Sequence, residues 1–146
     1  MAVDTSVKPQ AIQLKTQLVK KGRSRILLSE TDNSTFRIHC YATGTGENAL
    51  HAHLNEDHVF VVLKGVATFT GIDETPFKLG KNGAVVLPKG CFYQFANYGE
   101  EPLVMIRFGA HAEKFDNRIN PKGEPIGGRA SEGYGEPELI ENAFFE

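Results

Sequence analysis

The chain has 146 residues and a net charge of −2 at pH 7, and 40% of its residues are hydrophobic. This length suits a single domain that buries a real core. The slight acidic excess excludes a typical nucleic-acid-binding surface, which needs many basic residues. No apolar run approaches the roughly 20 residues of a membrane span, and the first ten residues lack the apolar core of a secretory signal. We therefore expect a compact cytoplasmic protein that binds neither nucleic acid nor a membrane.

A regular alternation of short apolar runs and turn-forming residues extends through the middle of the chain. Turn-forming residues recur about every eight to twelve positions, which is typical of an antiparallel sandwich or barrel. The expected strands are residues 25–29, 35–42, 49–54, 58–64, 66–71, 76–79, 84–87, 91–97 and 103–108. The sequence therefore predicts an all-β fold whose barrel core spans about residues 25–109.

The two ends of the chain differ in character from this core. The N-terminal extension, residues 1–24, contains enough apolar residues over 7–19 to form an extra edge strand. The C-terminal arm or tail, residues 110–146, is rich in Gly, Pro and charge, and its prolines block regular pairing. This composition is typical of a partly disordered tail, but its last apolar residues can dock on the barrel: Leu139, Ile140, Phe144 and Phe145. We treat residues 1–146 as one domain with two extensions.

The expected strand 58–64 is apolar on both faces. Because side chains alternate along a strand, one face carries His58, Phe60 and Val62. The opposite face carries only aliphatic residues: Val59, Val61 and Leu63. A strand of this kind is covered on both sides, by the barrel interior and by a second sheet or a partner subunit. We predict a homodimer that uses the outer face.

Three of the five histidines of the chain lie within eight residues: His51, His53 and His58. His51 and His53 are two residues apart, so a strand places both imidazoles on one face, roughly 7 Å apart along the backbone. His58 begins the next expected strand after a short turn, so a hairpin brings it opposite the pair. Imidazole binds zinc, iron, nickel, copper and cobalt, so the spacing predicts a metal site without naming the ion.

This segment resembles the first motif of the cupin superfamily, G(X)5HXH(X)3,4E(X)6G. His51 and His53 match the histidine pair and Gly65 matches the closing glycine, while His58 stands where the glutamate ligand of the family is usual. The opening glycine is displaced, since Thr45 holds its position. The resemblance covers about residues 25–109 and implies a jelly-roll barrel, an antiparallel double-stranded β-helix, with the site in its mouth.

The second motif of the family, G(X)5PXG(X)2H(X)3N, is matched by Pro88, Gly90 and Asn97. Asn82 stands in place of its first glycine, and Tyr93 in place of the fourth ligand, which is usually histidine. The resemblance thus implies a metal site made of His51, His53, His58 and Tyr93. The Tyr93 phenol is also expected as a packed aromatic ring, as a donor to a substrate, or as a catalytic acid or base.

The two departures from the motif have an electrostatic consequence. With Tyr93 protonated, as its usual pKa of about 10 indicates, the four candidate ligands carry no negative charge. A divalent ion, either Fe(II), Zn, Ni or Mn, would then keep nearly all of its charge. It would favour a carboxylate, an enolate or another chelating oxygen anion in its open positions. We therefore expect one divalent transition-metal ion and a small anionic substrate.

The ligand set has alternatives close to the motif. Glu56 or Asp57 replaces His58 if the turn slips by one residue. Cys91 shares the expected strand face of Tyr93 and is a candidate soft ligand or a core residue. A cupin that kept its barrel and lost its metal is the alternative to the whole site.

Three further polar residues have open roles. His39 is expected near the mouth or in a packed position, and His111 in an exposed loop after the last strand. Arg107 either holds an anion inside the barrel or pairs with an acidic residue outside it. The cavity is expected to be mostly apolar, lined by Phe60, Val62, Val86, Phe95 and Ile106.

Two classes of function fit these residues. The first is a metal-dependent enzyme: three imidazoles on iron(II) leave adjacent positions for a chelating substrate and dioxygen, and cupins with three-histidine sites resemble such dioxygenases. On zinc, nickel or manganese the same site supports an isomerase, cyclase or lyase reaction, with Tyr93 as acid or base. The second class is a non-catalytic module that binds a small acid in the barrel.

Overall fold

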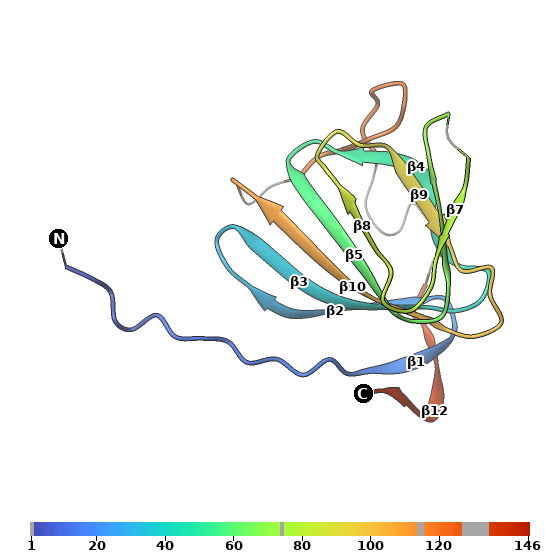
Figure 1. The fold of residues 1–146 in the computed structure, drawn as a ribbon, viewed down its shortest axis with the longest axis horizontal. Helices are drawn as coiled ribbons and strands as arrows, with labels where there is room; N and C mark the ends of the chain where they lie inside the picture. The colour runs from blue at the N-terminus through green and yellow to red at the C-terminus, as the bar shows by residue number, and fades with distance from the viewer. Residues whose placement is uncertain (1, 74, 114–115, 127–134) are drawn as a thin grey trace.

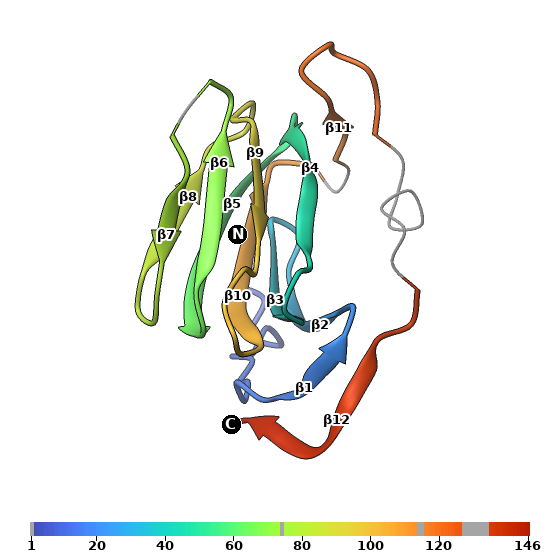
Figure 2. The same cartoon turned by 90° about the vertical axis from the view of Figure 1, so that its right-hand side faces the viewer.

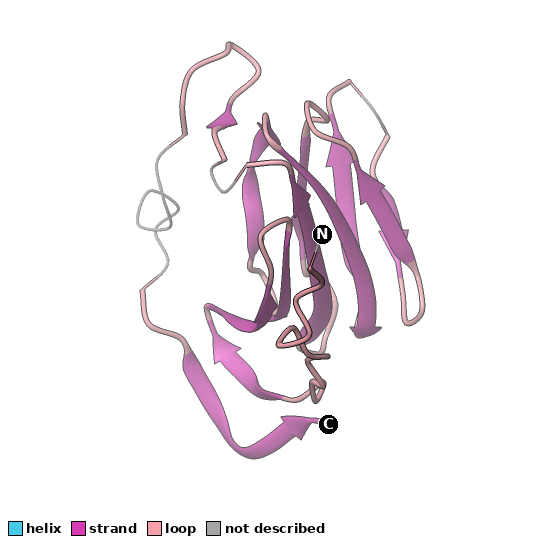
Figure 3. Ribbon diagram, turned by 90° about the vertical axis from the view of Figure 1, so that its left-hand side faces the viewer, coloured by secondary structure: helices cyan, strands magenta, loops and turns pink. Residues whose placement is uncertain are grey.

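All regular structure in the described part of the chain is β-strand (Figure 3). The computed structural model describes residues 2–73, 75–113, 116–126 and 135–146. In chain order the strands are β1 (Thr16–Lys21), β2 (Arg23–Glu30), β3 (Ser34–Tyr41), β4 (Gly46–His53), β5 (Glu56–Lys64), β6 (Ala67–Gly71), β7 (Phe77–Leu79), β8 (Ala84–Leu87), β9 (Tyr93–Ala96), β10 (Leu103–His111), β11 (Arg118–Ile119) and β12 (Glu138–Phe145). Over these ranges no helix is long and apolar enough to cross a membrane.

Two antiparallel sheets face each other and form a jelly-roll barrel (Figures 1 and 2). The first sheet has the strand order β2-β3-β10-β5-β8, and the second has the order β11-β4-β9-β6-β7. Apart from the consecutive pairs β2-β3 and β6-β7, neighbouring strands in these sheets come from distant parts of the chain, as in a double-stranded β-helix. The predicted all-β antiparallel fold is therefore confirmed.

Aromatic and aliphatic side chains pack between the two sheets. Alternation along β5 turns Phe60 and Val62 into this core, where both are 0% exposed. The ring of Phe60 meets the ring of Phe95 nearly edge to face, with centroids 5.3 Å apart. The other buried members of the cluster are Tyr41, Ala67, Phe69, Leu87, Tyr93, Leu103 and Met105.

The two ends of the chain pair with each other below the barrel (Figure 2). β1 and β12 form a separate two-stranded sheet in which Thr16 lies opposite Phe145. Val19 and Phe145 pack against a second cluster made of Ile38, Cys40, Ala42 and Val104. The edge strand predicted over 7–19 is thus formed only from Thr16 onward, and the apolar C-terminal end docks as a strand. Parts of the predicted tail, 114–115 and 127–134, lie outside the described residues.

Candidate metal and anion site

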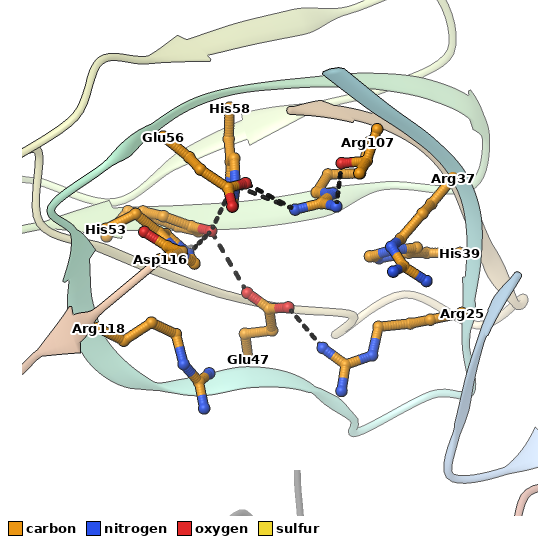
Figure 4. Close-up of a pocket in the computed structure, with 12 residues that line it drawn as sticks. Arg25, Arg37, His39, Glu47, His53, Glu56, His58, Arg107, Asp116 and Arg118 are labelled. Atoms are coloured by element: carbon orange, nitrogen blue, oxygen red, sulfur yellow. Dashed lines mark hydrogen bonds and ion pairs between the residues drawn. The ribbon is translucent and has the colours of Figure 1, made fainter. Parts of the chain in front are cut away.

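A cavity of about 440 Å³ opens between the two sheets. Its walls are polar, and Figure 4 shows charged side chains from several strands turned toward it. The lining residues are Arg25, Thr35, Arg37, His39, Glu47, His53, Glu56, His58, Tyr93, Arg107, Asp116 and Arg118. A volume of this size is in the usual range for a small-molecule site.

The prediction of a mostly apolar cavity is wrong. Three of the residues expected to line it lie in the packed core: Phe60, Val62 and Phe95. Val86 faces outward on β8, where it is 64% exposed. On β10 it is Arg107 that lines the cavity rather than its neighbour Ile106, because successive side chains of a strand face opposite sides. Arg107 therefore lies inside the barrel, which is one of the two positions expected for it.

The strand pattern brings the four predicted site residues together. His51 and His53 lie on β4 with one residue between them, so both rings are on the same face of the strand, and their centroids are 5.1 Å apart. A short turn leads into β5, where the His58 ring lies 4.0 Å from the His53 ring. Tyr93 on β9 is paired with His51 across the sheet, with ring centroids 4.5 Å apart.

The two imidazoles of β4 are held by their Nδ1 atoms. His51 Nδ1 donates a 2.7 Å hydrogen bond to the carbonyl oxygen of Ala49, and His53 Nδ1 donates to the carboxylate of Asp116. Each Nε2 then carries the lone pair that a metal ion needs. His51 is 2% exposed, and its Nε2 has no hydrogen-bond partner among the described residues. Burying an acceptor without a donor is unfavourable, and a bound cation would satisfy it.

Glu47 is a member of the site that the sequence reasoning missed. Its Oε2 lies 3.6 Å from His51 Nε2, and its Oε1 lies 3.6 Å from Nη1 of Arg25. Burial acts to raise the pKa of Glu47, but the neighbouring His51 imidazole and the Arg25 guanidinium lower this pKa more. The carboxylate therefore stays ionised and lies beside His51, whereas the predicted ligands His51, His53, His58 and Tyr93 include no negative charge.

The early start of β4 explains why Glu47 reaches the site. β4 begins at Gly46, ahead of the predicted strand 49–54. A Cβ atom at Gly46 would lie 2.2 Å from the carbonyl oxygen of Phe95, so only glycine lets β4 approach β9 this closely. The pairing register then shifts between Glu47 and His51. The sequence does contain a local indication of this position. Glu47 stands an even number of residues before His51, and such a spacing places both side chains on one face of a strand.

His58 is held on its far side by two charged groups. Its Nε2 lies 3.0 Å from Glu56 Oε1 and 3.0 Å from Nη1 of Arg107. Burial lowers the pKa of His58, although the hydrogen bond to Glu56 opposes this. Asp57 instead accepts a 2.8 Å hydrogen bond from the backbone N–H of Lys89 and does not line the cavity. Of the residues at the start of β5, Glu56 and His58 thus line the cavity, and the His58 ring lies beside the His53 ring.

The Tyr93 hydroxyl lies between the other donor atoms. It is 3.3 Å from His53 Nε2, 3.4 Å from His58 Nδ1 and 3.5 Å from Glu47 Oε2. Burial raises the pKa of Tyr93 well above its usual value, so the phenol is protonated. Tyr93 therefore carries a proton within reach of an imidazole nitrogen and of a carboxylate.

The donor atoms fit a metal ion in chemistry, and two of their separations are close to those of metal ligands. In a four-coordinate site with bonds of about 2.1 Å, neighbouring ligand atoms are roughly 3.4 Å apart. The separation is 3.6 Å from His51 Nε2 to Glu47 Oε2 and 3.3 Å from the Tyr93 oxygen to His53 Nε2. Within the described ranges, however, no group of three or more His, Cys, Asp and Glu side chains is arranged so that it could hold an ion. Several contacts run through the Tyr93 hydroxyl instead, so ligation requires rearrangement of these side chains.

The remaining candidates are divided between the cavity and other places. His39 lines the cavity from β3. His111 is 8% exposed at the end of β10, so its predicted loop position is wrong, because β10 continues past residue 108. Cys91 precedes β9 and packs against the core, and it does not line the cavity.

Four arginines line the cavity, against three carboxylates. Only Arg107 was expected there from the sequence, whereas Arg25, Arg37 and Arg118 line the cavity as well. The carboxylates are Glu47, Glu56 and Asp116. With neutral imidazoles the wall carries an excess of positive charge, which favours an anionic guest.

Comparison with known proteins gives one family and a set of related folds. Residues 37–108 match the family model described as Cupin domain. Over 80 residues the chain is 29% identical to the uncharacterised protein YdbB of Bacillus subtilis. The aligned segment covers 55% of this chain and 68% of YdbB.

Solved structures resemble the chain in fold. An uncharacterised protein with a double-stranded β-helix domain from Klebsiella pneumoniae has a TM-score of 0.60 at 18% identity, covering 82% of this chain and 96% of that one. The DMSP lyase DddQ from Ruegeria pomeroyi has a TM-score of 0.57 at 16% identity, covering 70% and 53%. At these identities the likeness establishes the fold alone.

Proposed function

Residues 37–108 of this chain are a cupin domain, and we propose that its cavity binds one divalent transition-metal ion and acts, like a dioxygenase, on a small anionic, chelating substrate. One observation carries the proposal. Two imidazoles are fixed through Nδ1 with Nε2 turned to the site, and an ionised carboxylate, Glu47, lies beside them. Two histidines and one carboxylate with open positions are the ligand set of many non-haem iron(II) oxygenases.

In this proposal His51, His53 and Glu47 hold the ion, and His58 and Tyr93 lie at its edge. Iron(II) is the ion that best suits an oxygenase, and zinc, nickel and manganese are the others that this donor set accepts. When bound, the ion would supply a Lewis acid with open positions for the oxygen atoms of a chelating substrate. The protonated Tyr93 hydroxyl would donate a hydrogen bond to that substrate, and the arginines of the wall would stabilise its negative charge.

A second candidate is a metal-dependent isomerase, cyclase or lyase. The observation that favours it is the Tyr93 proton, which lies 3.3 Å from the acceptor nitrogen of His53. A protonated phenol beside an imidazole can deliver a proton to a leaving group or an enolate oxygen. A protein that binds a small acid without catalysing a reaction is the remaining alternative.

Metal reconstitution followed by oxygen uptake tests the proposal. Protein stripped of metal and supplied with Fe(II), Zn, Ni or Mn is expected to retain about one ion per chain after dialysis. With iron(II), oxygen uptake is expected in the presence of one member of a panel of diketones, catechols and thiols. Failure to retain any of the four ions, in protein that remains folded, overturns the proposal. Metal retention with substrate conversion that needs no oxygen selects the second candidate.

The outer face of the sheet β2-β3-β10-β5-β8 supports a homodimer, which we include in the proposal. Phe36, Phe108, Val59 and Val86 form one row of paired positions across four adjacent strands. Phe108 is 37% exposed and Val86 is 64% exposed. Apolar residues gathered on a sheet face are typical of a contact between identical subunits, because the same patch then covers itself.

The first residues of the chain also extend away from the barrel (Figure 1), with Val3 83% exposed.

Changing Val86 to glutamate is expected to dissociate this dimer. A charge placed in the middle of an apolar contact must be buried without a partner, which weakens association by about tenfold or more. Light scattering after size-exclusion chromatography is expected to give twice the chain mass of 16.1 kDa for the unmodified protein and a shift toward one chain for Val86→Glu. The matched control is Ile72→Glu, since Ile72 is 44% exposed and lies after β6. A monomeric unmodified protein, or equal masses for both variants, contradicts the dimer.

A cytoplasmic location completes the proposal. Cys40 is a buried free thiol on β3, and burial raises its pKa to about 11. Such reduced thiols are usual in a reducing compartment. Cell fractionation that finds the protein in an oxidising compartment contradicts this part.

A further inference from the structure

A patch of polar residues lies across the cavity from the imidazoles. It consists of Arg25 on β2 with Arg37 and His39 on β3, and Arg107 on β10 adjoins it. Strand register sets the patch, because Arg25 is paired with His39 and Arg37 is paired with Arg107. Figure 4 shows Arg25, Arg37 and His39 together at one end of the cavity, with His53 and Asp116 at the other.

The positive charges of this patch oppose one another. Like charges directly opposite on neighbouring strands are destabilising. Burial lowers the pKa of Arg37, and the charges of Arg107 and Arg25 lower it further. Such a cluster is stable only where other features of the fold hold it together. A bound anion would reduce the repulsion between its positive charges.

The carboxylates of the cavity do not neutralise this patch fully. Arg25 pairs with Glu47 at 3.6 Å, and Arg107 lies 3.8 Å from Glu56. Arg107 also donates a 2.9 Å hydrogen bond to Thr35 Oγ1. By contrast, no carboxylate of the described residues lies within ion-pair distance, 4.0 Å, of the Arg37 guanidinium. The guanidinium of Arg37 is thus the one in this patch that lacks an ion pair within the described ranges.

His39 provides a second, independent sign of a ligand. It is 1% exposed, and its Nε2 has no hydrogen-bond partner among the described residues. Its Nδ1 lies 2.8 Å from the hydroxyl of Tyr41. With the Tyr41 hydroxyl as the donor to Nδ1, the proton of His39 lies on Nε2. A buried N–H group without an acceptor beside arginines is suited to an oxyanion.

We propose that Arg25, Arg37 and His39 bind a second anionic group of the substrate, so that the substrate is a short acid with an anionic group at each end. The inference rests on the proposed function in one respect: the first anionic group is the one expected at the metal. The distal group is an oxyanion, either carboxylate or phosphate, because the planar fork of arginine binds both through two parallel hydrogen bonds. The patch would then set substrate specificity, while the imidazole end carries the chemistry.

Inorganic phosphate tests the distal site separately from the metal. Phosphate is titrated into the metal-stripped full chain and followed by calorimetry and by the unfolding temperature. Binding is expected for the unmodified protein and to be weakened about tenfold or more by Arg37→Gln, which removes the fork. The charge-matched control, Lys81→Gln, removes one positive charge at an exposed position away from the cavity and is expected to bind normally. Loss of phosphate binding in both variants, or in neither, overturns the inference.

A pair of five-carbon acids tests the full arrangement. With the zinc-loaded chain, glutarate, which has two carboxylates, is expected to bind about tenfold tighter than valerate, which has one. Arg37→Gln is expected to abolish this preference without changing the zinc content. If glutarate is bound no better than valerate while zinc is retained, the distal site is wrong and the metal site stands. If zinc is not retained but phosphate binding still depends on Arg37, the distal site stands and the metal proposal fails.

A further pair of variants keeps the test valid if Arg37→Gln does not fold. Arg37→Lys keeps the charge but loses the planar fork, and His39→Gln keeps a polar side chain while moving the donor atom. Both are expected to reduce phosphate affinity while the protein without phosphate remains folded. Retention of full affinity by both variants contradicts the assigned residues. On the metal-stripped chain, tighter binding of phosphate than of glutarate at the Arg37-dependent site would assign phosphate as the distal group, and the reverse would assign carboxylate.

Discussion

Replacing His51 with alanine is expected to reduce the bound transition metal from about one ion per chain to nearly none. His51 is 2% exposed, and its ring is fixed by the 2.7 Å hydrogen bond from Nδ1 to Ala49. Its Nε2 has no partner among the described residues, so the change removes a preoriented ligand together with its hydrogen bond to Ala49. Elemental analysis of dialysed protein gives the metal content of each variant.

The matched control for this change is His111→Ala. His111 is also a buried histidine, 8% exposed, and neither of its ring nitrogens has a hydrogen-bond partner among the described residues. It lies at the end of β10 and does not line the cavity that holds His53 and His58. We expect this variant to keep its metal. Equal metal loss in both variants would indicate general unfolding, and full retention by His51→Ala would remove His51 from the ligand set.

The close approach of the imidazoles was predictable because it depends on short-range geometry. His51 and His53 share a strand face by alternation alone, and a short turn is enough to bring His58 opposite them. The family motif added Tyr93, whose position comes from pairing with His51 across the sheet. To predict that these four residues lie together, it was enough to know one hairpin and one motif; no other strand neighbours had to be known.

Glu47 was missed because its position depends on a contact between distant strands. Gly46 reads locally as a strand break, but in the fold it allows β4 to meet the backbone of Phe95 on β9. Only then does strand β4 extend back to Glu47 and carry its carboxylate to His51. This omission matters for the chemistry, because the carboxylate of Glu47 adds a negative charge to the proposed ligand set.

The polarity of the cavity was missed for a related reason. Alternation shows that Arg37 and His39 share a face of β3, but it does not show which face is turned inward. The register of β3 with β10 decides this, because it sets Arg37 opposite Arg107 on the cavity side. The pairing of β1 with β12 joins residues from opposite ends of the chain, and no local pattern predicts such a contact.

Changing Asp116 to asparagine is expected to weaken metal binding by about 10- to 100-fold while the barrel stays folded. The Asp116 carboxylate accepts the Nδ1–H of His53 and the backbone N–H of Asn55, the latter at 3.3 Å. Burial acts to raise the pKa of Asp116, but the hydrogen bond from His53 and the neighbouring imidazole lower it more. The negative charge therefore makes the His53 Nε2 lone pair more basic and fixes the ring orientation. Asparagine keeps the shape of the side chain and loses the charge.

Competition with a zinc chelator measures this affinity, and Asp57→Asn is the matched control. Asp57 is also a carboxylate and lies on β5, but it accepts the backbone N–H of Lys89 at 2.8 Å and does not line the cavity. Its change removes the same charge close to the site without touching an imidazole, so zinc affinity is expected to stay the same. If both variants lose affinity equally, the effect is long-range electrostatics. If Asp116→Asn binds zinc as the unmodified protein does, His53 is not oriented through Asp116, and the geometric basis for treating it as a ligand is lost.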